Sequence, residues 1–294
     1  MKFGMFYPVA VARDVELGKA FWGLDRKRYG STIDDLREQA IAADETGWTS
    51  MMFAEHHFEV EGYHVTPNPL MLNVYLAQHT KRLRQGQMGL VLPNWNPLRL
   101  AEDIAMADHL TGGRLDVGLS RGYQPRSVGV MGQHVHANAA GSGRAEVEAT
   151  NRKVVEEWFE VMRRSWTEDL WDYQGQFIKV PPPGLEWTHP VSAKLKAGVE
   201  NGALKQVATV PKPLQSPYPP LFTTLSQSPE TINWSAKIGA SVVTLAANLD
   251  IVRWVFQTYV DEAAKHNRKL KFGQYSKSGG VVLCRNVAVG RTHE

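Results

Sequence analysis

Cysteine is almost absent from the sequence: Cys284 is the only one among 294 residues. An intrachain disulfide and a cysteine-based zinc site are therefore excluded, and a reducing compartment such as the cytoplasm is expected. No apolar run approaches the roughly 20 residues that cross a bilayer. Residues 1–10 are apolar, but they lack a small-residue cleavage pattern, so they read as a first strand and not as a secretion signal. These features predict a cytoplasmic protein with no membrane partner.

Charge blocks and nucleotide motifs are also missing. The 33 basic and 30 acidic residues give a formal charge of +3 and are spread along the chain, so no nucleic-acid partner is indicated. There is no P-loop, no G-x-G-x-x-G after the first apolar run and no G-x-S-x-G elbow. The usual nucleotide-binding and hydrolase interpretations therefore lose support.

What is present is an alternation of short apolar runs and helical patterns. Strands are predicted at 2–7, 48–54, 86–92, 115–119, 221–225, 241–246 and 280–289, and helices at 31–46, 68–79, 97–110, 144–166, 228–238 and 249–266. This order predicts an α/β fold with a parallel sheet, either closed as a (β/α)8 TIM-type barrel or open and doubly wound. A closed barrel needs eight strands and seven are counted, so we expect the last βα unit to be lacking.

Two stretches interrupt the alternation. Prolines concentrate between 170 and 220 and leave room for little more than a short hairpin near Trp171–Val180. The glycine-rich stretch Gly129–Gly143 is expected to be a mobile loop. We therefore predict one domain over 1–294 with insertions around 122–143 and 170–220.

Reactive groups of a parallel βα fold gather where strands end, and the first such corner is Glu55-His56-His57-Phe58. Adjacent histidines on an extended segment point in opposite directions, so at most one faces a given pocket. That histidine could exchange a proton near neutral pH. The alternative is that both histidines only pack and form hydrogen bonds.

Two more corners follow the next strands. Gly89, after Met88, interrupts an apolar run, which is typical of a bulge or of a close approach by a ligand. In Ser120-Arg121-Gly122 an arginine beside a glycine can present a planar donor fork to a phosphate. A packing glycine and a surface ion pair remain open as alternatives.

A fourth corner, Gln227-Ser228-Pro229-Glu230-Thr231, opens a helix with Ser228 as N-cap. Free backbone donors make such an end an anion site, although every helix needs a cap. His134 and His136 could join His56 and His57 in a zinc site, but they fall in the expected loop, so no metal site is predicted.

Taken in order, these corners resemble the luciferase-like flavin monooxygenase family. The similar segments, which span most of the chain, are 1–6, 53–58, 89–97, 100–103, 112–122, 211–222, 228–231 and 236–239. The chain departs from luciferase itself at Ala246, where luciferase has an aromatic residue, and at Gln227, where it has an acidic one. Light emission is therefore not implied.

The resemblance implies roles for individual residues in binding FMN. Arg121 and Gly122, with Gln227, Ser228 and Thr231, would hold the flavin phosphate. Met88-Gly89 would form a non-prolyl cis peptide under the isoalloxazine ring. Ser120 would lie beside the reactive carbon of the flavin, and His56 would be the acid–base residue.

The activity that the resemblance implies is oxygenation of a small organic substrate with reduced FMN and O2, the reduced flavin coming from a separate flavin reductase. The stretches 129–143 and 170–220 are candidate lids that keep water out. A homodimer that pairs through helices 68–79 and 97–110 is expected. The alternatives are a deazaflavin-dependent hydride transfer and a non-catalytic flavin-binding or partner subunit.

Overall fold

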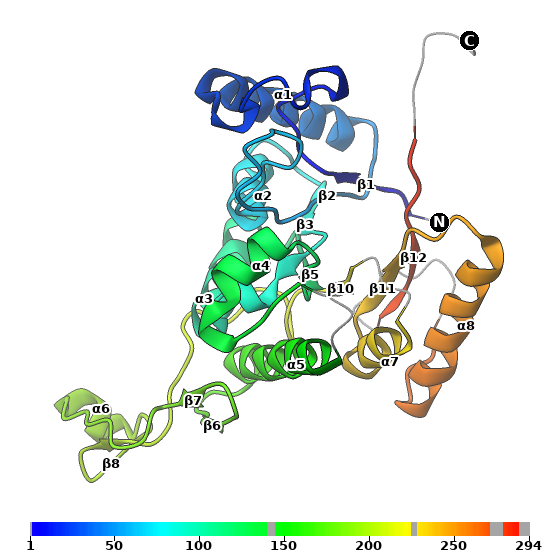
Figure 1. Cartoon of the computed structure of the whole chain (residues 1–294). Helices are drawn as coiled ribbons and strands as arrows, with labels where there is room; N and C mark the ends of the chain where they lie inside the picture. The colour runs from blue at the N-terminus through cyan, green and yellow to red at the C-terminus, as the bar shows by residue number, and fades with distance from the viewer. Residues whose placement is uncertain (1, 140–144, 225–227, 271–278, 288–294) are drawn as a thin grey trace.

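A curled parallel sheet forms the centre of the computed structural model, which describes residues 2–139, 145–224, 228–270 and 279–287 (Figure 1). Its strands are β1 (Gly4–Tyr7), β2 (Ser50–Phe53), β3 (Arg84–Gln87), β4 (Leu90–Val91), β5 (Leu115–Ser120), β10 (Leu221–Thr223), β11 (Ser241–Thr244) and β12 (Gly280–Leu283). The order is β1-β2-β3-β5-β10-β11-β12, with β4 also beside β5, and every pair is parallel. Within the described residues β1 and β12 each pair with one neighbour, so the sheet is a half-barrel. The predicted α/β barrel-type fold is confirmed.

Helices cover the outside of the sheet, as predicted for βα units. They are α1 (Arg26–Glu45), α2 (Pro69–Ala77), α3 (Pro97–Leu110), α4 (Pro125–Met131), α5 (Ala145–Thr167), α7 (Pro229–Ile238) and α8 (Leu249–Lys265). A further helix, α6 (Pro190–Leu195), lies away from the sheet (Figure 1). Of the helices described, none combines the length and the apolar character that a membrane crossing requires.

The start of α1 differs from the prediction by five residues. The predicted start was Ser31, but the side chain of Asp25 accepts hydrogen bonds from Lys27 N and Arg28 N and caps the helix there. The first turn of α1 is polar, so the apolar period on which the prediction rested begins only later in the helix.

The two faces of the sheet carry different apolar clusters because side chains alternate along each strand. Met51 and Phe53 of β2 pack with residues of α1 and α2 on the convex face. Met52, between them, faces the other way and packs with Phe222 and Val243 in a concave cluster. The concave cluster comprises Met52, Met88, Phe222 and Val243, with the partly buried Phe6, Val282 and Cys284 packed against it.

The stretch that was predicted to be a mobile loop is largely helical, which corrects that expectation. Residues 125–135 form α4 and a 3-10 helix (Gly132–Val135), and residues 140–144 lie outside the described part. Val128 and Val135 are buried in the same core as Trp158 of α5. Because the stretch is rich in glycine, its sequence does not indicate that these valines belong to the apolar core.

The proline-rich excursion folds into two small hairpins, β6 (Tyr173–Gln174) with β7 (Lys179–Val180) and β8 (Val199–Glu200) with β9 (Ala203–Leu204), plus α6. The predicted hairpin near 171–180 is confirmed. Glu157 of α5 holds its turn, because its carboxylate accepts hydrogen bonds from three backbone N–H groups, those of Gln176, Phe177 and Ile178. The rest of the excursion projects away from the sheet as an arm (Figure 1, lower left).

The excursion is attached at the amino ends of the strands. Gln215 donates hydrogen bonds to Asp108 at the end of α3 and to Leu115 O at the start of β5. Arg84, the first residue of β3, donates to Gln215 Oε1 over 3.0 Å. A connection from a helix to the next strand must lie at this end, whereas a ligand binds at the carboxyl ends. The expectation that 170–220 is a lid is therefore wrong.

Asp44, at the end of α1, is expected to make stability depend on pH. It is buried, and its carboxylate accepts hydrogen bonds from the backbone N–H groups of Lys81, Arg82 and Leu83. Burial is the largest single influence on the pKa of Asp44 and raises it, but the hydrogen bonds together outweigh burial and lower this pKa below 3.8. A lowered folded-state pKa stabilises the fold above about pH 4, and this stabilisation is lost as the pH falls through the folded-state pKa.

Asp44→Asn is therefore expected to lower the free energy of unfolding by about 1–3 kcal/mol at pH 7 and by clearly less at pH 3. Urea denaturation at the two pH values measures both differences. Asp34→Asn, on the same helix but 61% exposed, is the control and should change stability by less than about 0.5 kcal/mol. A difference for Asp44→Asn that is equal at both pH values would contradict the assignment.

Candidate functional site

Glu55 ties together three of the strand ends at the mouth of the half-barrel. Its side chain has no exposed surface and follows β2. The carboxylate accepts hydrogen bonds from His57 Nε2 at 2.9 Å and from Val91 N at 2.8 Å. It also accepts from Asn94 Nδ2 at 3.1 Å and from Trp95 Nε1 at 2.9 Å. Since Val91 belongs to β4 and pairs with Ser120 of β5, this one carboxylate fixes the ends of β2, β4 and β5 relative to one another.

The two adjacent histidines have separate partners, as expected for an extended segment. His57 pairs with Glu55, whereas the ring of His56 stacks on His64 with centroids 4.2 Å apart. The ring of Tyr123 meets His56 edge-on at 5.9 Å. His56 Nδ1 is buried, and within the described part of the chain it has no hydrogen-bond partner. His56 is therefore the histidine that has a ring nitrogen to offer to a bound molecule.

The Met88–Gly89 peptide is cis, as the resemblance implies, and it separates β3 from β4. Met88 N donates to Phe53 O at 2.7 Å, which brings this bend beside the end of β2. The neighbouring strand β5 contributes Gly118, where a Cβ would lie 2.0 Å from Gln87 O. Only glycine allows this approach of the two backbones. The side chain of Met88 lies in the concave cluster.

Ser120, Arg121 and Gly122 form the end of β5. Gly122 N donates to Ser120 Oγ at 3.1 Å, and Gly122 has a φ of +76°. A Cβ on Gly122 would lie 2.6 Å from Val91 Cγ1, so a side chain is excluded there. Arg121 is partly buried, and its Nη1 lies 2.9 Å from Glu148 Oε2 of α5. The turn thus presents a guanidinium that a carboxylate already orients.

The start of α7 lies near this arginine. Ser228 occupies the N-cap position, but its hydroxyl donates to Glu230 and makes no capping bond. The hydrogen bond from Ser228 is the main cause of the lowered pKa of Glu230, and the charges of Arg152 and Arg121 lower it further. Arg152 Nη2 is 3.8 Å from Glu230 Oε2. Two guanidiniums and the N-terminus of a ten-residue helix therefore converge here.

The remaining predicted residues of this corner are Thr231 and Gln227. Thr231 is partly buried in the first turn of α7, and its carbonyl oxygen accepts from Ser235 Oγ at 2.6 Å. Gln227 lies outside the described residues. All the other predicted site residues belong to the carboxyl ends of the strands or to the α7 start that follows β10.

These residues fit a flavin mononucleotide. The cationic corner at Arg121 and the start of α7 suits a phosphate, and the concave cluster offers an apolar surface to a ring. The carboxylates of Glu148 and Glu230 repel a bound anion, but each of them is paired with an arginine. The donor set and the apolar surface adjoin through β5, which carries Arg121 at its end and pairs with both β4 and β10.

The histidines considered for a metal site do not assemble. His134 Nδ1 lies 3.1 Å from Met131 O and its ring faces Trp158, while His57 is engaged by Glu55. Across the described part of the chain, no three His, Cys, Asp or Glu side chains are grouped closely enough to hold a metal ion.

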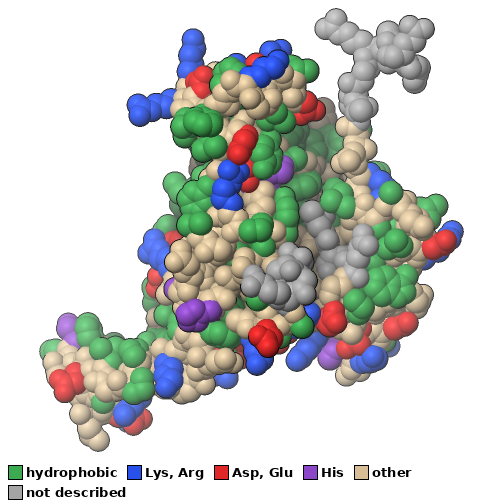
Figure 2. Space-filling model, in the orientation of Figure 1, with side chains coloured by type: hydrophobic (Ala, Val, Ile, Leu, Met, Phe, Trp, Pro, Cys, Tyr) green, Lys and Arg blue, Asp and Glu red, His purple; other side chains and the backbone are tan. Residues whose placement is uncertain are grey.

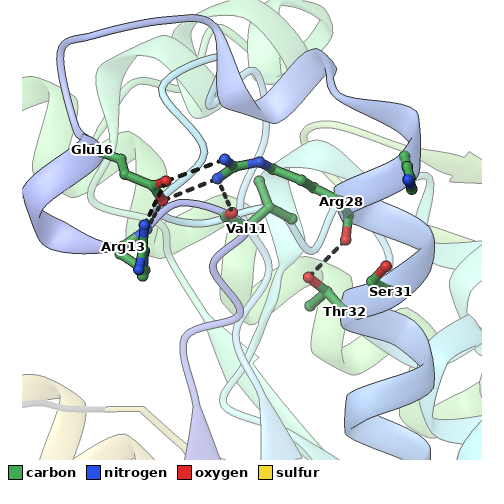
Figure 3. Close-up of a pocket in the computed structure, with 7 residues that line it drawn as sticks. Val11, Arg13, Glu16, Arg28, Ser31 and Thr32 are labelled. Carbon is green, nitrogen blue, oxygen red and sulfur yellow. Dashed lines mark hydrogen bonds and ion pairs between the residues drawn. The ribbon is translucent and has the colours of Figure 1, made fainter.

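A cavity of about 370 Å³ opens elsewhere, at the start of α1 (Figure 3). The carboxylate of Glu16 accepts hydrogen bonds from both Arg28 and Arg13 across it, and the guanidinium of Arg28 lies over the Trp22 ring. These hydrogen bonds, that from Arg28 foremost, hold the pKa of Glu16 far below its usual range. The arginine charges in this cavity are thus compensated within the protein.

The family model for luciferase-like monooxygenases matches residues 1–294. The chain belongs to this family. A relative from Acinetobacter baylyi, the oxygenase component of flavin-dependent trigonelline monooxygenase, is 25% identical over 218 residues, covering 74% of this chain and 50% of the relative. Protein y4wF of Sinorhizobium fredii is 29% identical over 255 residues, 87% of this chain and 61% of its own.

Solved structures of luciferase-like monooxygenases share the fold. The oxygenating constituent of 3,6-diketocamphane monooxygenase from Pseudomonas putida, solved in complex with FMN, superposes with a TM-score of 0.69 at 18% identity. That superposition covers 96% of this chain and 66% of the other. The chain spans between two fifths and about three fifths of the length of the first three curated relatives that it matches.

Several residues of the candidate site could not be predicted from the sequence. Glu55 stands in the motif Glu55-His56-His57, yet its partners Asn94 and Trp95 lie about 40 residues away, and nothing in the motif shows them. His64 has no motif at all. The sequence does place an acidic residue, Glu55, at the end of an apolar strand. A carboxylate buried at such a position needs hydrogen-bond partners, and this was the one signal for the network.

Proposed function

We propose that the chain is the oxygenase component of a two-component system that uses reduced FMN and O2 to oxygenate a small organic substrate. The observation that carries this proposal is the convergence of Arg121 and the start of α7 next to the concave apolar cluster. The family, whose relatives include a flavin-dependent oxygenase component, supports the same reaction class.

The roles of the residues follow from their chemistry. Arg121, Gly122, Ser228 and Thr231, with Gln227, hold the flavin phosphate through charge-assisted hydrogen bonds. Met88, Gly89 and Ser120 border the ring, and the glycine pair Gly89 and Gly118 lets the bend after β3 and the backbone of β5 come close to each other beside it. When bound, reduced FMN supplies the electrons that activate O2.

His56 is proposed as the acid–base residue. Its buried and unpartnered Nδ1 can accept or donate a proton to a reacting oxygen within the mouth. Glu55 engages Nε2 of the neighbouring His57, whereas Nδ1 of His56 is left for the substrate. The surrounding burial keeps bulk water away from this nitrogen.

The test is an anaerobic titration of the protein with reduced FMN and, separately, with a reduced deazaflavin, followed by mixing with oxygenated buffer. Micromolar binding of reduced FMN, with O2 consumed at a rate that differs from that of free reduced FMN, supports the proposal. Binding of the deazaflavin alone, without O2 consumption, would instead establish the hydride-transfer alternative. Binding of neither would leave the non-catalytic partner subunit.

A flavin reductase and a second copy of the chain are the proposed partners. A reductase would deliver the reduced flavin, as the relative that is the oxygenase component of a flavin-dependent monooxygenase suggests. The exposed Met71 of α2 and Met106 and Leu110 of α3 support pairing through these two helices. Sedimentation equilibrium measures the resulting dimer.

A further inference from the structure

The loop between β2 and α2 carries three buried polar atoms that lack a hydrogen-bond partner among the described residues. They are His56 Nδ1, His64 Nδ1 and Thr66 Oγ1. His56 is 8% exposed and Thr66 is 4% exposed. Buried polar atoms in folded proteins are nearly always paired, so three in one loop point to a bound molecule that supplies the missing hydrogen bonds.

The three residues lie together. The rings of His56 and His64 are stacked at 4.2 Å with 22° between their planes, and His56 N donates to Thr66 O at 3.0 Å. The edge-on ring of Tyr123 lies next to His56 and is 62% exposed, so it can turn aside without uncovering the core. A small molecule can thus reach the pair from the mouth of the half-barrel.

The charges around the loop disfavour an anionic ligand. Arg126 pairs with Glu59 at 2.5 Å and with Glu61 at 2.8 Å, so one cation already faces two carboxylates. An anionic ligand would find no uncompensated positive charge there. Burial first, and then the neighbouring His56, lower the pKa of His64, while Glu59 acts in the opposite direction. The lowered pKa favours the neutral ring of His64, which offers hydrogen bonds without charge.

We propose that His56, His64 and Thr66 form a subsite for a neutral hydrogen-bonding group, a carbonyl or hydroxyl, of the organic substrate. This inference rests on the proposed oxygenase function, because it places that group next to the acid–base residue. His64 and Thr66 are positioning residues here: they orient the substrate toward His56 and the flavin.

Two probes that share one ring test the subsite: cyclohexanone, which is neutral, and cyclohexanecarboxylate, which is anionic. In protein with ¹⁵N-labelled histidine, NMR reports the ring nitrogens directly. We expect cyclohexanone to shift the signals of His56 and His64, and the carboxylate to leave them unchanged. His64→Phe, which keeps a stacked ring, and Thr66→Val, which keeps the shape, should each weaken cyclohexanone about 5- to 10-fold.

His79→Phe is the matched control, because His79 is exposed and its ring also packs edge-on against an aromatic neighbour, Tyr75. It should leave the affinity unchanged. Three results would overturn the proposed subsite. They are binding of the carboxylate as tight as that of cyclohexanone or tighter, no signal shift with cyclohexanone, and an unaltered cyclohexanone affinity in both variants. Reduced FMN is also titrated into the unsubstituted protein. A ketone response without FMN binding counts against the proposed function, and FMN binding without a ketone response counts against the subsite.

Discussion

Glu55→Ala is expected to lower the free energy of unfolding by about 3–5 kcal/mol, the range for removing one partner of a buried charged network. The substitution leaves His57 Nε2, Trp95 Nε1 and the backbone N–H of Val91 buried without an acceptor, and each such group keeps its desolvation cost. It also releases the ends of β2, β4 and β5 from one another. Chemical denaturation followed by tryptophan fluorescence measures the loss.

Two further variants distinguish the loss of the hydrogen-bond network from the loss of a carboxylate as such. Glu55→Gln retains an acceptor oxygen but presents an amide donor to the other N–H groups, so an intermediate loss is expected. Glu156→Ala removes an exposed carboxylate from α5 and should change stability by less than about 0.5 kcal/mol. A loss below about 1 kcal/mol for Glu55→Ala would show that the four hydrogen bonds do not stabilise the mouth.

Arg121→Ala is expected to weaken the binding of reduced FMN about 10- to 100-fold, the equivalent of losing hydrogen bonds to a charged group. The reason is specific to the phosphate, so the affinity for reduced riboflavin, which has none, should be unchanged. Anaerobic titration of both flavins, followed by quenching of tryptophan fluorescence, gives the two ratios.

The carboxylate of Glu148 provides an opposite test. It competes with a phosphate for the guanidinium of Arg121, 2.9 Å away, so Glu148→Gln should strengthen FMN binding several-fold at low ionic strength. Arg99→Ala is the control, since Arg99 is exposed and pairs only with Asp103 on α3. An equal loss of riboflavin and FMN affinity in Arg121→Ala would indicate general damage to the site and would remove Arg121 from the phosphate assignment.

The sequence predicted the order of strands and helices because each buried segment carries its own apolar period. It predicted Met88-Gly89 and the Ser120-Arg121-Gly122 turn because glycines at strand ends are local signals. Helix α4 was missed because it is short and contains Gly129, and the burial of its Val128 depends on packing in the same core as α5.

The position of the excursion could have been predicted from topology, because it connects a helix to the next strand. The Glu55 network and the stacked pair of His56 and His64 could not, because they join residues through the folded path of the loops and not through any repeat. Surface charge gave no help, since acidic and basic side chains are interspersed over the visible face (Figure 2).

The arm is attached through Gln215, Asp108 and Arg84, at the end of the sheet opposite the candidate site. Changes in the arm and changes in the site can therefore arise separately during evolution. A connection at the amino ends of the strands can lengthen, shorten or acquire apolar side chains such as Leu185, Trp187 and Leu195 without moving a residue that touches the substrate. Conversely, the corners that select the substrate can vary without disturbing the arm. New surfaces for assembly and new chemistries can therefore be selected independently within one polypeptide.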